Sequence, residues 1–549
     1  MRLNEKFLPL SVAALLAASR LLEIFSLKYD SDELQHMHTV WSWANGLVQY
    51  RDLFDNHTPL FHMLLAPFIA LFGATPHLLL YGRLLMLPLF AADLYFVYLA
   101  AETVFDRETA LWTSLAAGFA LNFSGASVEF RPDNLWLALF AASTYLLLKK
   151  ENTLRSGAGF GLLTAANSLV SLKTLVFLLP AAALAWFFSW LCSGKPRGGF
   201  LRFAAGAALA AALVWLVFLS LFYELGALKA MFYGTLLHNL LPSVYTDPGR
   251  KAGVAALWLL AGFLPARRLK AAAGPLRLLW FLAFSLLAVS VLYPVLERET
   301  RLPVTQTAAV LAGGLLFSGL KKKAPDGSVR VVILAGALVF FVFLVRRHSD
   351  RAQNLAEERL WSDILRLTDP DDYVMDAKGE NIFRRRPYYY ALELFTKRRM
   401  QAGLLDPERI GADMSRQKDW VLVTLDKEAF PASLTAIGEK DFLEVSPFIE
   451  VAGARLRPAP GRGATAAFDV LVEGGYSFLP AAAGRKLDGR PLVPGADVYL
   501  LPGRHRFDFG NRADAVCAVF SKAVERGFIP AGCRSVAGQL RDYKNVIRR

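Results

Sequence analysis

The sequence predicts a polytopic α-helical membrane domain followed by a soluble tail, first α/β and then β-sandwich-like. Hydrophobic residues make up 54% of the 549 residues, and the mean hydropathy is +0.35. That is the composition of a membrane protein. Long apolar runs fill residues 1–345, whereas residues 346–549 have the composition of an ordinary soluble protein. Two domains follow, one in lipid and one in water.

Apolar runs long enough to cross a bilayer divide the first domain into about eleven predicted transmembrane helices. They fall near residues 7–27, 78–101, 109–124, 132–148, 156–171, 174–192, 203–222, 252–265, 277–295, 302–320 and 330–345. Residues 59–72 are apolar but form a run of only about 14 residues, which is typical of an interfacial or re-entrant helix.

Basic residues between the apolar runs predict the orientation of the chain. The formal net charge is +14, and much of it lies in short loops between runs, where the positive-inside rule accounts for it. We therefore expect no nucleic-acid partner. If residues 59–72 do not cross, every basic cluster lies inside. The outer loop, residues 28–58, and the whole tail then lie outside.

The tail is predicted to contain two regions. Residues 346–448 combine helical patterns with short apolar runs and form the α/β region. The helical patterns and runs are at residues 352–367, 373–376, 388–402 and 420–425. Residues 449–549 alternate apolar and polar positions between Gly and Pro turns, which predicts the sandwich. Cys517 and Cys533 could form a disulfide if the tail lies outside an oxidising membrane.

Residues 30–60 are the most polar stretch beside a predicted span and are the candidate active site. Ionisable groups at a membrane edge are costly in lipid and indicate a water-facing site. Asp30, Asp32 and Glu33 place adjacent carboxylates near a low-dielectric boundary, which suits a general base. The alternative is a solvated end of the loop.

Two histidines in this stretch are candidate metal ligands. His36 and His38, with Asp32 four residues before His36, could hold a divalent ion if the segment is helical. Hydrogen-bonding or interfacial histidines are the other interpretation. The sequence predicts no other cofactor.

The acidic pair Asp32-Glu33, and then Asp55-Asn56-His57-Thr58-Pro59-Leu60, resemble the first outer loop of GT-C fold glycosyltransferases. The similar families are protein O-mannosyltransferases and lipid A aminoarabinose transferases. Thr58 stands where the first proline of the family motif often stands, which argues against the protein-mannosylating branch. The resemblance implies a GT-C-like membrane domain with catalytic roles for Asp32, Glu33 and Asp55.

The resemblance also implies substrate-binding residues further along the chain. Lys173 ends a Gly-Leu stretch that is similar to one in the family, and it is expected to meet a lipid phosphate. Snorkelling to ordinary headgroups is the alternative role for this lysine. Arg301 precedes an apolar run as in the family. Arg131 and Asp133 lie in a predicted outer loop, and with His57 they complete the expected binding residues.

GT-C enzymes transfer a sugar, with inversion, from a polyprenyl phosphate to an acceptor hydroxyl on the outer face of the membrane. We expect this chain to do the same in a bacterial inner membrane, with its tail in the periplasm. The acceptor stays open between protein, lipid and glycan. A transporter or flippase of lipid-linked sugars is the alternative, although the sequence contains no repeated halves.

Overall fold

The computed structural model describes residues 7–120, 125–149, 153–192, 198–240, 248–266, 274–292, 297–323, 328–347, 352–458, 465–510 and 514–533. The chain divides into two compact units. Unit 1 comprises Met1–His36, Asn56–Leu71 and Leu78–Asn354. Unit 2 comprises Met37–Asp55, Phe72–His77 and Leu355–Arg549. Residues 37–55, more than half of the predicted outer loop, therefore belong to the same unit as the tail.

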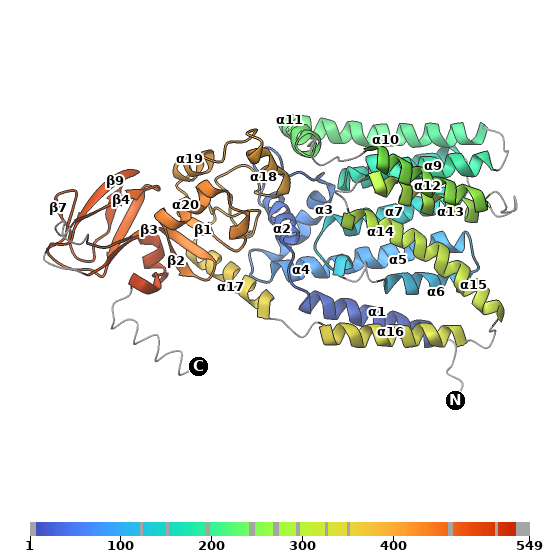
Figure 1. Cartoon of the computed structure of the whole chain (residues 1–549), viewed down its shortest axis with the longest axis horizontal. Helices are drawn as coiled ribbons and strands as arrows, with labels where there is room; N and C mark the ends of the chain where they lie inside the picture. The colour runs from blue at the N-terminus through green and yellow to red at the C-terminus, as the bar shows by residue number, and fades with distance from the viewer. Residues whose placement is uncertain are drawn as a thin grey trace. The chain divides into compact units, whose positions relative to one another are not determined.

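Unit 1 is built from helices that run alongside one another (Figure 1). Its elements are α1 (Phe7–Ser26), the start of α2 (Ser31–Ala44), α3 (Leu60–Phe72), α4 (Leu78–Leu84), α5 (Met86–Glu102), α6 (Arg107–Gly118), η1 (Gly125–Ser127), α7 (Pro132–Leu148), α8 (Leu154–Val170), η2 (Thr174–Leu178), α9 (Leu179–Leu191), α10 (Gly198–Glu224), α11 (Leu228–Phe232), η3 (Tyr233–Leu237), α12 (Pro248–Ala266), α13 (Gly274–Leu292), α14 (Glu297–Ala308), η6 (Ala309–Gly313), α15 (Gly314–Lys323) and α16 (Ser328–Arg347).

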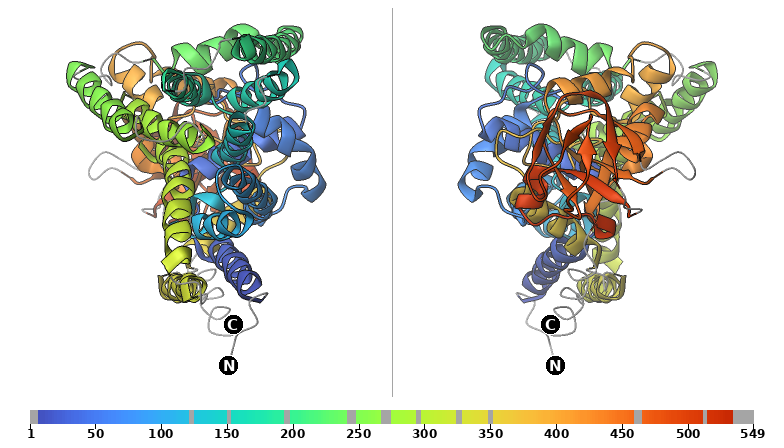
Figure 2. Two further views of the ribbon diagram at one scale, coloured as in Figure 1. Left: turned by 90° about the vertical axis from the view of Figure 1, so that its right-hand side faces the viewer. Right: turned by 90° about the vertical axis from the view of Figure 1, so that its left-hand side faces the viewer.

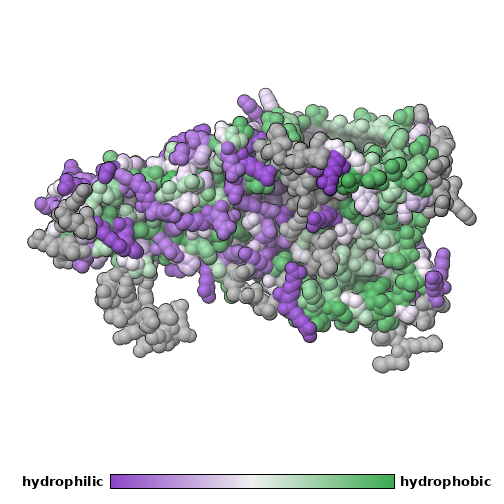
Figure 3. Space-filling model, viewed as in Figure 1, coloured by the Kyte–Doolittle hydropathy of each residue, from purple (hydrophilic) through white to green (hydrophobic). Residues whose placement is uncertain are grey.

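Seven helices among the described residues are long and apolar enough to cross a membrane. Large aliphatic side chains lie exposed on them, such as Leu209 on α10 and Val339 on α16. The surface of unit 1 is correspondingly apolar (Figure 3). The chain is therefore an integral membrane protein. The other four predicted runs overlap the helices α6, α7, α8 and α12, which have 12, 17, 17 and 19 residues.

Glycines bring α8 and α10 into backbone contact. A Cβ added at Gly157 or Gly161 would overlap the carbonyl oxygen of Phe203 or Ala207, and one added at Gly206 would overlap that of Leu154. This is the close approach that small residues spaced four apart permit between membrane helices. The helices of unit 1 are seen end-on in the left view of Figure 2.

Unit 2 contains the end of α2 and the tail. Its elements in the tail are α17 (Ala352–Leu367), α18 (Leu394–Gln401), α19 (Arg409–Arg416), β1 (Val421–Val423), η7 (Lys427–Ala429), α20 (Ala432–Asp441), β2 (Phe442–Ser446), β3 (Ile449–Leu456), β4 (Thr465–Val470), β5 (Gly474–Leu479), β6 (Lys486–Leu487), β7 (Arg490–Pro491), β8 (Val498–Leu500), β9 (Gly503–Asp508), β10 (Val516–Phe520), α21 (Ser521–Glu525) and η8 (Ala531–Cys533).

Two antiparallel sheets form the end of unit 2. One has the order β1-β3-β10-β5-β8 with β2 paired to β3, and the other has the order β4-β9-β6-β7. Buried residues of both sheets share one hydrophobic core, in which Phe478 of β5 stacks on Phe507 of β9. This arrangement confirms the predicted β-sandwich-like end.

Three details of the tail differ from the sequence expectation or extend it. The predicted boundary at residue 448 falls inside a sheet, because Val421 of β1 pairs with Val451 of β3. Helix α18 begins only after Glu393, whose carboxylate accepts from two backbone N–H groups at the helix start, so residues 388–393 are not helical. Cys517 and Cys533 form a disulfide, as predicted.

Candidate active site

The acidic residues at the start of α2 cap the N-terminal end of this helix. The carboxylate of Asp30 accepts from the N–H of Asp32 at 2.9 Å, and the N–H of Asp30 donates to Glu33 Oε1 at 2.9 Å. These reciprocal contacts cap the helix in a manner close to a capping box, with the N–H of the second rather than the third helical residue as donor. Carboxylates in the first helical turn also interact favourably with the helix dipole. The sequence pattern therefore has a structural role before any chemical one.

Glu33 is held by a buried ion pair with Arg83 of α4. Arg83 donates to the two carboxylate oxygens at 2.5 and 2.8 Å, and both side chains are fully buried. The N–H of Phe130 also donates to Glu33, at 2.8 Å. With four hydrogen bonds accepted, the Glu33 carboxylate has little capacity left for a substrate. Its contacts favour an orienting role.

Arg131 joins four carboxylates into one cluster. Its Nη1 lies 2.9 Å from Asp32, 3.7 Å from Asp30 and 3.9 Å from Glu129. Its Nε lies 3.2 Å from Asp133. The Asp32 side chain keeps 35% of its surface exposed, whereas the Arg131 side chain keeps 8%. Asp32, like Asp30 with 36% of its side-chain surface exposed, is therefore a carboxylate that an incoming molecule can reach beside a buried cation.

Lys173 extends this cluster to the end of a span. Its Nζ lies 3.2 Å from Asp133 Oδ1 and 5.7 Å from the centroid of the Trp136 ring. Lys173 directly precedes the candidate span Thr174–Leu191. Asp32, Arg131, Asp133 and Lys173, here called the charge network, thus form a chain of ion pairs. The structure brings together four of the predicted site residues.

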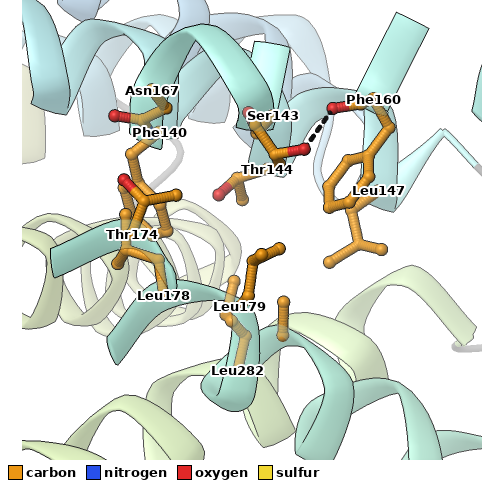
Figure 4. Close-up of a pocket in the computed structure, with 12 residues that line it drawn as sticks. Phe140, Ser143, Thr144, Leu147, Phe160, Asn167, Thr174, Leu178, Leu179 and Leu282 are labelled. Atoms are coloured by element: carbon orange, nitrogen blue, oxygen red, sulfur yellow. Dashed lines mark hydrogen bonds between the residues drawn. The ribbon is translucent and has the colours of Figure 1, made fainter. Parts of the chain in front are cut away.

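A cavity opens one residue beyond Lys173. It lies between α7, α8, α9 and α13 (Figure 4). Thr174, whose hydroxyl accepts from Trp136 Nε1 at 2.9 Å, lines it. Most of the lining is aliphatic or aromatic, but Asn167 contributes a buried Oδ1 without a hydrogen-bond partner. The cavity could hold part of a largely apolar chain, and Lys173 is the sequence neighbour of its lining residue Thr174.

Three histidines, His36, His57 and His62, form a cluster in unit 1. His36 Nδ1 lies 3.0 Å from His62 Nε2, and the His36 ring meets the His57 ring edge-on at 4.6 Å between centroids. His57 also acts electrostatically on Asp133 of the charge network. Thr58, the departure from the family motif, donates to the carbonyl oxygen of Ser168 at 3.3 Å.

His38 and Asp55 lie in unit 2 and make different contacts. His38 Nδ1 hydrogen-bonds the carbonyl oxygen of Ile382 at 3.0 Å. Burial, reinforced by the positive charge of Arg386, lowers the pKa of His38 to about 4. Asp55 is fully buried and accepts from the hydroxyl of Thr39 at 3.1 Å.

The two predicted metal ligands are thus engaged in separate contacts, His36 with His62 and His38 with a carbonyl group. Within the described ranges, no group of three or more His, Cys, Asp and Glu side chains could hold a metal ion. The structure therefore gives no ligand set for the predicted ion.

Three more residues bear on the site. Arg301 is a predicted binding residue, whereas Arg83 and His62 were not predicted as site residues from the sequence. Arg301 lies exposed on α14, and the ion pairs of the charge network do not include it. Arg83 lies within the predicted span at residues 78–101, and nothing in the sequence identifies Glu33 as its partner. His62 lies in the apolar run at residues 59–72, where a single histidine is an obvious but ambiguous signal.

Fold and site together define a polytopic membrane protein with a charged site at the end of its helices. No protein-family model and no curated protein matches the sequence. Among solved structures, the oligosaccharyltransferase of Archaeoglobus fulgidus in its apo form is similar, with 11% identity, a TM-score of 0.46, and coverage of 89% of this chain and 74% of that one.

A second structure, the archaeal oligosaccharyltransferase AglB from the same organism in complex with an inhibitory peptide and a dolichol-phosphate, has the same identity and coverage with a TM-score of 0.41. The same enzyme in complex with Zn and sulfate is 12% identical, with a TM-score of 0.40 and coverage of 78% of this chain and 71% of that one.

Proposed function

We propose that the chain is a GT-C type membrane glycosyltransferase that transfers a sugar from a polyprenyl phosphate to an acceptor hydroxyl, with inversion. The observation that carries this proposal is the charge network at the start of a span. It combines a reachable carboxylate, Asp32, with two cations, Arg131 and Lys173, in one chain of ion pairs.

In the proposed reaction, Asp32 takes the proton of the acceptor hydroxyl as its oxygen attacks the anomeric carbon. The bond from that carbon to the phosphate oxygen breaks, and the lipid phosphate leaves with the electron pair. Lys173, and Arg131 beside it, would stabilise the charge that develops on the phosphate. Asp133 holds Lys173 in position until the phosphate competes for it.

The cavity next to Lys173 supports a lipid donor. Lys173 directly precedes Thr174, which lines the mostly apolar cavity, and a cation near such a cavity matches a molecule with a phosphate head and an isoprenoid tail. The mostly apolar lining of the cavity suits the first part of an isoprenoid tail, and the remaining tail would lie in the bilayer.

The disulfide in the tail supports an outer location for unit 2. Disulfides persist in oxidising compartments and are rare in the cytosol, so a Cys517–Cys533 bridge fits a periplasmic tail. We propose the inner membrane of a bacterium as the location, with the site on its outer face. Protein, lipid and glycan acceptors all present the hydroxyl that the reaction needs.

The test is incubation of the purified protein with a panel of labelled polyprenyl-phosphate sugars and an acceptor extract. The expected result is consumption of one donor with release of the lipid phosphate. The Asp32→Asn variant should neither consume the donor nor release the lipid phosphate. Donor movement across liposomes without release of lipid phosphate would instead identify a flippase. Adding a chelator to the same assay tests whether His36 and His38 serve a divalent metal.

A further inference from the structure

Unit 2 contains a polar pocket, which is separate from the charge network and from the mostly apolar cavity of unit 1. It is partly open to solvent, and polar and apolar side chains both line it. The end of α2, the following loop and a segment of the tail line it, and all of these belong to unit 2. Its functional side chains are His38, Asp52, Arg385, Arg386, Tyr388 and Tyr389.

The two arginines give the pocket its donors. The Arg385 side chain is exposed and makes no hydrogen bond or ion pair in the described part of the chain. The Arg386 side chain is only 4% exposed. Its Nη1 donates to the carbonyl oxygen of Ala377 at 3.3 Å, its Nε lies 3.8 Å from Asp376, and its Nε has no hydrogen-bond partner. The buried guanidinium group of Arg386 and the guanidinium group of Arg385, which makes no ion pair, can together bind an oxyanion through two or more hydrogen bonds.

The carboxylate in the pocket does not cancel these charges. Asp52 is already bound by its neighbour Arg51, at 2.8 Å, and by the N–H of Val48, at 2.7 Å. These contacts neutralise and fix it. Arg385 also acts electrostatically on Asp52, but Arg51 shares that carboxylate, so the two arginines leave the pocket lining with a net positive charge.

The rest of the pocket suits the body of a hydroxylated molecule. The carbonyl oxygen of Ile382 only accepts, so His38 donates from Nδ1, and Nε2 of the neutral ring is an acceptor. Tyr389 is held by a hydrogen bond from its hydroxyl to the carbonyl oxygen of Tyr50 at 2.5 Å, and its ring packs edge-on against Phe54. The ring of Tyr389 can pack against the face of a sugar ring, and Nε2 of His38 can accept a hydrogen bond from one of its hydroxyls.

We propose that this pocket binds a phosphorylated or carboxylated monosaccharide, with its oxyanion on Arg385 and Arg386 and its ring against Tyr388 and Tyr389. The inference does not depend on the proposed transfer reaction, because binding alone tests it. The oxyanion chemistry is shared by free sugar phosphates and lipid headgroups, so the experiment must separate these sources.

The test is isothermal titration calorimetry on the full chain in detergent, with glucose 1-phosphate, glucuronate, inorganic phosphate and glucose as probes. At least one anionic sugar should bind about tenfold or more tightly than glucose or phosphate. Arg385→Gln should weaken that binding about tenfold or more, because hydrogen bonds to charged groups contribute on this scale. Arg409→Gln, at a site that is also exposed, is the matched control and should bind like the wild type.

Arg385→Gln is preferred to a change at Arg386, whose proximity to the buried Asp376 makes it a folding risk. The proposal is overturned if neither anionic sugar binds saturably, if glucose binds equally well, or if Arg385→Gln binds like the wild type. If inorganic phosphate binds as tightly as glucose 1-phosphate, the proposed contact of the sugar ring with Tyr388 and Tyr389 is refuted. Loss of sugar binding in nanodiscs containing phosphatidylglycerol would assign the arginines to lipid headgroups and also overturn the proposal.

Discussion

Replacing Glu33 by Gln should destabilise the protein far more than it affects the chemistry. The substitution keeps the size of the side chain but removes the charge opposite Arg83, in a pair that is fully buried. Breaking such a pair by removing one partner costs about 3 to 5 kcal/mol, because the other charge stays buried. Arg83 also donates to the carbonyl oxygens of Ile24, Leu27 and Lys28, so we expect the lower end, about 3 kcal/mol.

The assay is thermal unfolding of purified protein in detergent, followed by tryptophan fluorescence. Asp32→Asn is the matched control, since its side chain is 35% exposed and its pair with Arg131 should contribute about 1 kcal/mol or less. Removing both charges, in Glu33→Gln with Arg83→Gln, should recover part of the loss. Equal midpoints for Glu33→Gln and Asp32→Asn would refute the orienting role of Glu33.

Three further predictions concern the site and unit 2. Asp32→Asn should lower transfer about 100-fold or more with donor binding intact, as loss of a general base does; an active Asp32→Asn beside a dead Asp55→Asn would move the role to Asp55. Lys173→Ala should weaken polyprenyl-phosphate binding by about 1.5 to 3 kcal/mol, measured by titration with the lipid phosphate. The pKa of His38 is about 4 in the folded protein, below its ordinary value of 6.5, so the unfolded chain takes the proton first as pH falls. Stability should therefore decrease between about pH 6.5 and pH 4, by about 3 kcal/mol in all, and His38→Asn should flatten this part of the pH profile of the unfolding midpoint.

Features that depend on local sequence were predictable. Apolar runs such as residues 330–345 identify helices because burial in lipid needs continuous hydrophobic length. The helix at residues 352–367 was predicted with the bounds of α17, since the turn-rich residues after it give a clear stop signal. The alternation of apolar and polar residues identified the sandwich, because it is the local pattern of a strand with one buried face.

Features that depend on distant pairing were not predictable. Asp32, Arg131 and Lys173 were each found as charges beside predicted spans, yet nothing in the sequence links them into one network. The pairing of Glu33 with Arg83 joins residues 50 positions apart, and only the fold selects that partner. The same holds for β1 and β3, whose pairing crosses the predicted boundary of the tail.

The glycine contact between α8 and α10 has a consequence for mutational scanning of this protein. Side chains at Gly157, Gly161 and Gly206 would collide with main-chain atoms, which cannot move aside as a flexible side chain can. Substitutions there should abolish activity as completely as loss of Asp32, although these positions touch no substrate. In an activity-only scan, α8 would therefore look like an extension of the active site. Measuring the amount of folded protein for each variant would separate the two groups.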